Sequence, residues 1–306
     1  MEMETPAIVD AHQHFWDLGR NYHPWLVDAE MIPFRYGDYA ALRRNYLPAD
    51  YRRDTAGHRV VATVHIEAEW DPGDPVGETR WLAALREQTG FPTVAVAQTR
   101  LDAADAGDIL AAQAAFDFVR GIRHKPATAP SPESIVIGAP GSMGDRRWRE
   151  GYAMLARYGL SFDLQTPWWH LAEAAALARD FPGTPIIVNH TALPADRSAE
   201  GLAAWRSALA LAAREPNVAL KISGLGQRGE RWQREANAPI VRDAIAIFGA
   251  ERCMFASNYP VDSLVGSFDT IYAGFMAIVA DMPPALRRRL FHDNAVRIYR
   301  IPDAVA

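Results

Sequence analysis

The sequence predicts a (β/α)8 barrel, the TIM-barrel fold, as a single domain over residues 1–306. Eight short runs rich in Val, Ile, Leu and Phe alternate with longer helical patterns, which is the order of a parallel sheet with crossover helices. The length also fits, because α/β barrels of roughly 250 residues commonly form one domain. An open doubly wound sheet is the alternative fold, but no glycine-rich fingerprint follows the first run.

Each predicted strand is a short apolar run bounded by proline, glycine or a charged residue, as expected for strands that are buried on both faces. In a parallel barrel the carboxyl ends of all strands meet at one rim. The predicted strands are Ile8–His12, Val60–Glu67, Thr93–Gln98, Phe118–His124, Leu160–Gln165, Pro185–His190, Asn217–Ser223 and Arg252–Asn258.

Helical patterns fill most of the segments between these strands. Ser198 is a predicted N-cap, and Pro283 and Pro284 suit the first turn of the last helix. The predicted helices are Val76–Thr89, Ile109–Phe116, Arg147–Tyr158, His170–Phe181, Ser198–Arg214, Ile240–Phe248, Phe268–Val279 and Pro283–Ile298.

Two long segments interrupt the alternation and distort the predicted barrel. Phe15–Asp50 follows the first strand and Lys125–Gly144 follows the fourth, and both are rich in turn formers. Each begins at the carboxyl end of a strand, the face on which such barrels place their active sites. We therefore expect both loops to border a functional site.

Composition and charge exclude several classes of protein. With 49% hydrophobic and 23% charged residues the chain is globular and not disordered. The net charge of −5, from 32 Lys and Arg against 37 Asp and Glu, disfavours a nucleic-acid partner. No apolar run approaches the roughly 18 residues that a membrane span needs, and residues 1–6 do not resemble a signal peptide.

The single cysteine, Cys253, lies in an apolar run, so we expect it to pack in the core. A chain with one cysteine cannot form an internal disulfide, which favours a reducing compartment. The sequence therefore predicts a soluble cytoplasmic protein.

Polar residues gather where the predicted strands end. His12 and His14 are two residues apart and should point to the same side of an extended chain, as should His65 and Glu67. Burying imidazoles, a lysine and carboxylates together costs several kcal/mol of folding free energy unless the groups are paired or bind a metal. The constellation therefore predicts an active site, to which the other strands contribute Gln98, Arg100, Arg123, His124, Asp163, Gln165, Asn189, His190, Lys221, Ser223, Asn258 and Asp262.

Five motifs occur in order along the chain: VDAHQHFW over 9–16, GIRH over 121–124, VNHT over 188–191, KISGL over 221–225 and HDNA over 292–295. Together they resemble the amidohydrolase-2 family of the amidohydrolase superfamily. Within it they are similar to the branch of sugar-acid lactonases and 2-pyrone-4,6-dicarboxylate lactonase. The resemblance covers essentially the whole chain.

The resemblance implies a barrel that hydrolyses esters, lactones or amides, in some members with one divalent metal. It implies His12, His14 and His190 as candidate ligands of Zn²⁺ or Mn²⁺, and it leaves the metal requirement open. The strand-six histidine of the family, here His190, contacts the reacting carbonyl or a metal. Arg123 and Lys221 match positions that bind an anionic or polarised oxygen.

One position departs from the family pattern. The general base of the family is an aspartate at the end of strand eight, in a Ser-Asp-Trp-Pro type of motif. Here the motif reads Ser257-Asn258-Tyr259-Pro260, and a neutral amide cannot accept a proton from water. Asp262 is the candidate replacement, although capping of the following helix is a structural alternative for it. Glu67 is the next candidate base.

Lactone hydrolysis is the predicted activity, and it requires a positioned water, a base and donors for the developing oxyanion. The predicted catalytic residues are Asp262 as the base, His190 and Lys221 on the side of the carbonyl, and Asn258. The group that polarises the carbonyl is expected to be His190, Lys221 or a metal held by His12 and His14. Aromatic loops predict a ring-shaped substrate, and cations predict that it carries a carboxylate or hydroxyls. The predicted substrate-binding residues are Glu67, Arg123, His124, Gln165 and Trp168.

Two other functions stay open. A metal-dependent decarboxylase of an aromatic acid is one, because the family includes such enzymes. A non-catalytic binding protein is the other, and Asn258 in place of aspartate motivates it. The expected partner is a small molecule, with neither nucleic acid nor membrane, and a homo-oligomer is left open because barrels of this size commonly self-associate.

Overall fold

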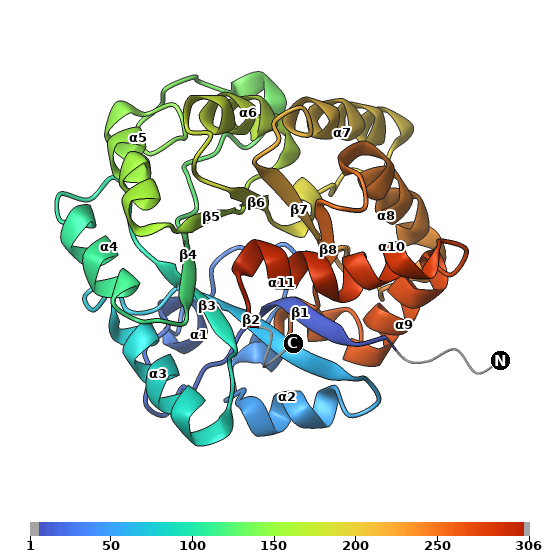
Figure 1. Ribbon diagram of the computed structural model, residues 1–306, viewed down its shortest axis with the longest axis horizontal. Coiled ribbons are helices and arrows are strands. Elements are labelled where there is room, and N and C mark those ends of the chain that lie inside the picture. The colour runs from blue at the N-terminus through green and yellow to red at the C-terminus, as the bar shows by residue number, and fades with distance from the viewer. Residues whose placement is uncertain (1–5, 303–306) are drawn as a thin grey trace.

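The computed structural model describes residues 6–302, which form a nearly closed barrel of eight parallel strands surrounded by helices (Figure 1). Each strand pairs with the next one along the chain, so the predicted fold is confirmed. All eight predicted strands are present, as β1 Ile8–Gln13, β2 Val60–Ile66, β3 Val94–Gln98, β4 Val119–Arg123, β5 Ser161–Leu164, β6 Ile186–Val188, β7 Val218–Ile222 and β8 Cys253–Phe255. Residues 1–5, where no signal peptide is predicted, and 303–306 lie outside the described part of the chain.

The barrel closes between β1 and the residues that follow β8. The N–H of Asn258 donates to the carbonyl of His12, and the N–H of His14 donates to the carbonyl of Tyr259, both at 2.8 Å. Gln13 and Tyr259 form a parallel bridge at the same place. Closure therefore brings the histidines of β1 beside the motif that contains Asn258.

The helices predicted between residues 76 and 298 are present, with shifted ends. Residues 24–27 and 48–54 are also helical, which the sequence analysis does not predict. Ser198 caps α7, because its Oγ accepts the N–H of Gly201 at 3.0 Å. Helix α8 begins earlier than predicted and contains Pro239, whose missing N–H removes a single backbone hydrogen bond near the helix start. The helices are α1 Pro24–Val27, α2 Pro48–Asp54, α3 Gly77–Thr89, α4 Ala106–Ala114, α5 Arg146–Ala153, α6 Leu171–Asp180, α7 Ala199–Ala212, α8 Arg234–Phe248, α9 Phe268–Ile278, α10 Pro284–Arg288 and α11 Asn294–Tyr299.

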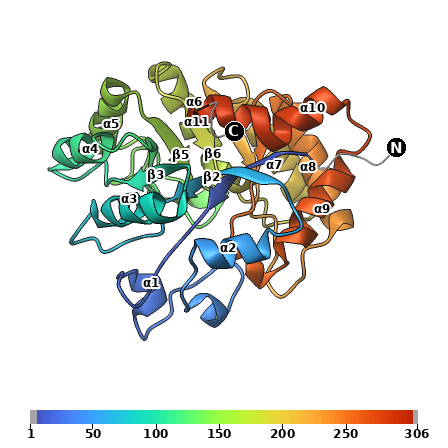
Figure 2. The ribbon, with the colours of Figure 1, turned by 60° about the horizontal axis from the view of Figure 1, so that its bottom comes forward.

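The two ends of the barrel differ. The predicted terminal helix is α10 and α11 joined by a π-helical segment, Arg289–Asp293, and α11 lies across the centre of the barrel in Figure 1. Tyr299 of α11 belongs to the apolar cluster inside the barrel, so this end is closed. In Figure 2 α1 and its loop project from the opposite end. The open rim is therefore the one where the strands end and the long loops begin.

Side chains alternate between the barrel interior and the helix layer. On β2, Val64 and Ile66 belong to the inner cluster, and His65 points outward to α3, where its Nε2 lies 3.0 Å from Glu78 Oε1. The prediction that His65 and Glu67 point to the same side is wrong. Strand β2 ends at Ile66, so the side chain of Glu67 no longer follows the alternation of the strand. No helix within residues 6–302 is both long and apolar enough to cross a membrane.

Cys253 is buried in the layer between the sheet and the helices, as predicted. Burial raises the pKa of its thiol well above the usual value. A protonated thiol packed in the core is a structural side chain and not a nucleophile.

Candidate active site

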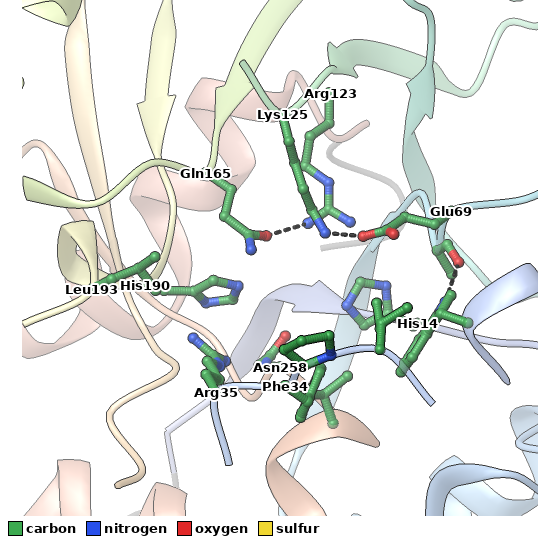
Figure 3. A pocket seen from close by; sticks show the side chains of 15 residues that line it. His14, Phe34, Arg35, Glu69, Arg123, Lys125, Gln165, His190, Leu193 and Asn258 are labelled. Carbon is green, nitrogen blue, oxygen red and sulfur yellow. Dashed lines mark hydrogen bonds and ion pairs between the residues drawn. The ribbon is translucent and has the colours of Figure 1, made fainter. Parts of the chain in front are cut away.

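A cavity of about 290 Å³ lies at the rim where the strands end (Figure 3). Five residues that the sequence predicts for the site line it: His14, Arg123, Gln165, His190 and Asn258. They come from different strands of the barrel and converge only because the sheet closes. The other lining residues are Trp25, Ile32, Pro33, Phe34, Arg35, Ala68, Glu69, Lys125, Leu193 and Val261.

Three imidazoles form the buried side of the site. The ring centroids of His12 and His14 are 5.0 Å apart, and those of His12 and His190 are 4.5 Å apart. The prediction that His12 and His14 point to the same side is thus confirmed. Burial, together with nearby cations such as Lys221 and Arg123, lowers the pKa of all three imidazoles well below the usual value. The three histidines are therefore neutral near pH 7.

Hydrogen bonds assign the tautomer of His14. Its Nδ1 lies 2.7 Å from the carbonyl oxygen of Ile66, which only accepts, so Nδ1 carries the proton. Its Nε2 is then unprotonated, and the ring also interacts with the side chain of Asn258. The His190 Nδ1 lies 3.0 Å from Ser223 Oγ. When that hydroxyl donates, Nε2 of His190 carries a proton toward the cavity.

A strained turn presents His190. The residues His190, Thr191, Ala192 and Leu193 all have φ between 52° and 56°, a left-handed conformation that costs L-residues about 1–2 kcal/mol each. Gly224 lies against this turn with φ +61°, and a Cβ there would come within 2.8 Å of the His190 ring. Such strain persists only where the surroundings impose it, and it is typical of functional sites.

Lys221 lies beneath the histidines and does not line the cavity. Its Nζ donates to Asp163 Oδ1 at 2.5 Å and lies 3.5 Å from His12 Nδ1. Asp163 also accepts from Tyr299 at 3.0 Å and from Asn189 Nδ2 at 2.9 Å. Burial lowers the pKa of Lys221 to about 8, against the attraction of Asp163. We call this buried network of Lys221, Asp163, Tyr299 and Asn189 the charged floor of the site. Because Lys221 does not line the cavity, its Nζ is not placed to contact a substrate carbonyl there.

Asn258 stands between the cavity and Asp262. The Nδ2 of Asn258 donates to Asp262 Oδ1 at 2.6 Å, and the Tyr36 hydroxyl donates to the same oxygen at 3.0 Å. The guanidinium of Arg35 lies 3.4 Å from it. Burial raises the pKa of Asp262, and Arg35 opposes that shift. Asp262 thus holds the wall of the site from behind and does not itself line the cavity.

The capping alternative for Asp262 is wrong. The next helix, α9, is capped by Ser267, whose Oγ accepts the N–H of Thr270 at 3.0 Å. The carboxylate of Asp262 bonds to the side chains of Asn258 and Tyr36 instead. Asp262 therefore stabilises the side chains around the cavity and does not cap a helix.

Arg123, Glu67 and Gln165 form one hydrogen-bonded group. Arg123 Nε lies 2.5 Å from Glu67 Oε1. Its Nη1 donates to Gln165 Oε1 at 3.2 Å, as Figure 3 shows. Both charged side chains are buried, with 4% and 3% of their surface exposed. Glu67 is therefore paired with Arg123 and is not a free carboxylate.

The sequence reasoning missed several lining residues. Glu69 and Lys125 form an ion pair at the edge of the cavity (Figure 3), and Arg35 enters it from the loop after β1. Lys125 lies two residues after the end of β4, and this position near a strand end is a signal in the sequence. Arg35 and Glu69 lie on loops whose path the sequence pattern does not predict.

Two predicted substrate-binding residues lie elsewhere. His124 lines a second, adjacent cavity of about 390 Å³ and accepts the N–H of Leu101 at 3.1 Å. Trp168 is half-buried against the core and lines neither cavity. Its ring packs edge-on against Trp169, with the centroids 5.5 Å apart. The structure thus places Trp168 as packing and His124 as a neighbour of the site.

The three histidines are the candidate ligands of a metal. His12 Nε2 is buried and has no partner among residues 6–302, and neutral imidazoles are suitable ligands. However, no three His, Cys, Asp or Glu side chains in that range lie together so that they could hold a metal ion. The nearby carboxylates Glu67, Glu69, Asp163 and Asp262 are each paired with a cation. His12, His14 and His190 therefore gather as predicted but do not fit as three ligands of one metal.

The chain matches the family described as Amidohydrolase over residues 9–301. A Sinorhizobium fredii protein named y4mH is 40% identical over 98% of this chain and 100% of its own length. An L-fucono-1,5-lactonase of Burkholderia ambifaria is 29% identical over 96% of this chain and 95% of its own.

Solved structures agree with the fold. A crystal structure of an amidohydrolase from Burkholderia multivorans with bound HEPES has a TM-score of 0.78 and 25% identity, covering 97% of this chain and 100% of that one. A second crystal form of that protein, with bound zinc, has the same TM-score of 0.78 at 24% identity and shows the fold alone. Because the family match spans nearly all of the barrel that carries the histidine-lined cavity, this chain belongs to the amidohydrolase family.

Proposed function

We propose that this protein is a hydrolase that opens the lactone of a sugar acid, or of a related carboxylated ring, by attack of an activated water. One observation carries the proposal: neutral imidazoles and three cations converge on one cavity beside an aromatic wall. Imidazoles supply proton transfer, cations bind negative oxygens, and an aromatic wall packs against a ring. The lactonase relative supports the same reaction class.

In this proposal His14 is the general base. Its Nδ1–H is held by the carbonyl of Ile66 at 2.7 Å, so Nε2 is the atom that takes a proton from water. The Asn258 carboxamide faces His14, and Asp262 orients it by accepting from Nδ2 at 2.6 Å. A carboxamide oxygen held in this way stabilises the imidazolium that forms. Asp262 thus acts through Asn258, which revises the prediction that Asp262 is itself the base.

The electrophilic side of the reaction belongs to His190 and the cations. His190 Nε2–H donates to the lactone carbonyl oxygen, and Arg123, Arg35 and Lys125 favour the negative charge that develops there. Water adds to the carbonyl carbon as its proton passes to His14. The tetrahedral intermediate then breaks its ring C–O bond, and the leaving alkoxide takes the proton back from His14. The product is the open-chain hydroxy acid, and no step uses a metal.

The first experiment is acid release in weak buffer with a pH indicator, over a panel of sugar-acid γ- and δ-lactones and aryl-acid lactones. We expect turnover of at least one lactone well above its spontaneous rate, and loss of that turnover in His14→Asn. His292→Asn, far from the cavity, is the matched control. An inactive wild type across the panel, or a fully active His14→Asn, would count against the proposal. CO₂ release from an aromatic acid would favour the decarboxylase alternative.

A further inference from the structure

A second cavity of about 390 Å³ adjoins the active-site cavity. The two share part of their lining, so one wall separates them: Trp25, Ile32, Glu69, Arg123 and Lys125 line both. The first cavity, at about 290 Å³, is at the lower limit of ordinary ligand sites, which run from about 300 to 1,000 Å³. It accommodates a single small ring, which leaves the second cavity without a role in the proposed reaction.

The shared wall has a fixed part and a weak part. Arg123 and Glu67 are buried and paired, with 4% and 3% of their side chains exposed. Lys125 and Glu69 are paired too, but 40% and 39% of their side chains are exposed. An exposed ion pair contributes only about 0–1 kcal/mol. A ligand that spans both cavities can therefore rearrange Lys125 and Glu69 without disturbing the buried pair.

The two cavities differ in charge. In the first, Arg35, Arg123 and Lys125 face the single carboxylate Glu69, which suits an ester carbonyl that becomes negative. The second has no excess of positive charge, because its cations Arg100, Arg123 and Lys125 face Asp28, Glu30, Glu67 and Glu69. The second cavity therefore suits a neutral polar group and not an anion.

The remaining lining of the second cavity narrows the chemistry. Trp25 and Trp70 provide apolar indole surface, and Gln98, Arg100 and Glu30 provide planar amide, guanidinium and carboxylate groups. Planar groups of this kind bond to pairs of neighbouring hydroxyls, and indole surface packs against the C–H face of a sugar ring. We propose that the second cavity is a subsite for a second sugar ring, so that the preferred substrate is a glycosylated sugar lactone with its lactone ring in the histidine-lined cavity.

This inference rests on the proposed lactonase function and is tested with matched substrates. D-Glucono-1,5-lactone is compared with its 4-O-glycosyl forms, cellobiono-, maltobiono- and lactobiono-1,5-lactone, which carry the same lactone ring. We expect kcat/KM at least tenfold higher for one or more of the glycosyl forms. The double variant Asp28→Ala, Glu30→Ala changes residues that line only the second cavity. It should reduce that ratio to about one and leave gluconolactone hydrolysis unchanged. Glu87→Ala on the outer face of α3 is the control.

The outcomes separate the two proposals. Hydrolysis of gluconolactone with no preference for any glycosyl form overturns the subsite alone. A preference that survives in the double variant also overturns it, because the second cavity would then not be its source. Failure of the enzyme to open any lactone of the set or of the wider panel overturns the proposed function itself.

Discussion

The side chain of Asn258 donates to the carboxylate of Asp262 at 2.6 Å, and both groups are buried. The amide occupies the position of the family's basic aspartate, and a carboxylate stands directly behind it. Asn258 lines the cavity, and the carboxylate of Asp262 lies on its far side. An aspartate at position 258 would therefore place two carboxylates at hydrogen-bond distance.

Replacing Asn258 with aspartate should lower stability at neutral pH. Two buried carboxylates at hydrogen-bond distance share a proton, so the pKa of the pair rises above the unfolded value of about 4. The penalty is absent below that pH and grows as pH rises through the raised value. We expect the Tm of Asn258→Asp to fall relative to wild type by on the order of 2–4 °C for each kcal/mol lost. Thermal unfolding at pH 4.5 and 7.5 measures this, and equal differences at both pH values would contradict it.

The pH dependence of turnover should report His14. Burial lowers its pKa well below the usual 6.5, so the base is neutral, and kcat/KM should stay flat from pH 6 to 8. The rate should fall only as pH drops toward the lowered pKa, because the imidazole is then protonated. A general base contributes on the order of 10²–10⁴-fold, which is the loss expected for His14→Asn.

Asp262→Asn separates a base from a positioning residue. We expect it to reduce kcat by roughly tenfold, far less than loss of His14, because the variant still fills the space behind Asn258. Its acidic limb should move to lower pH, because loss of the nearby negative charge lowers the pKa of His14. A loss as large as that of His14→Asn, with an unshifted profile, would return the base assignment to Asp262.

Breaking the buried pair of Glu67 and Arg123 should cost stability as well as binding. Removing one partner leaves an uncompensated buried charge, which typically costs about 3–5 kcal/mol. Glu67→Gln keeps the shape but loses the charge, so we expect a lower Tm and a raised KM. The double variant Glu67→Gln, Arg123→Met should recover part of the Tm without recovering KM. Denaturation and steady-state kinetics on the three proteins give both quantities.

Adding a side chain at Gly224 should displace His190. A Cβ there meets the His190 ring at 2.8 Å and Arg35 at 2.9 Å, at a φ of +61° that disfavours L-residues. We expect Gly224→Ala to lose activity by on the order of 10²-fold, since a catalytic group displaced by about 1 Å costs that much. Gly183→Ala, where a Cβ meets nothing within 4 Å, is the control. Full activity in Gly224→Ala would show that His190 does not need its present position.

Metal removal should leave the proposed reaction intact. Three cations lie near the histidines: Arg123, Lys221 and Arg35. Because no unpaired carboxylate offsets their charge, they disfavour the binding of a metal cation. We expect kcat/KM within about twofold after extended chelation and dialysis. A loss that Zn²⁺ restores would mean that the imidazoles rearrange to bind it, and zinc titration by calorimetry would then give the stoichiometry.

The sequence by itself determined the barrel and the identity of most of its rim. Eight apolar runs with helical patterns between them specify the strands, because burial on both faces leaves a pattern that local residues carry. The strand ends and the motifs also predict His14, Arg123, Gln165, His190 and Asn258, which line one cavity. Each of these lies at or next to a strand end, where position along the chain determines position at the rim.

Only the tertiary structure decided which polar groups face each other across the barrel. The pairings of Lys221 with Asp163, Arg123 with Glu67 and Asn258 with Asp262 depend on closure of the sheet and the path of the loops. These contacts decide protonation, because burial and neighbouring charges set each pKa. Spacing along a strand carries none of that information, so it predicts Lys221 at the rim but not its buried ion pair with Asp163.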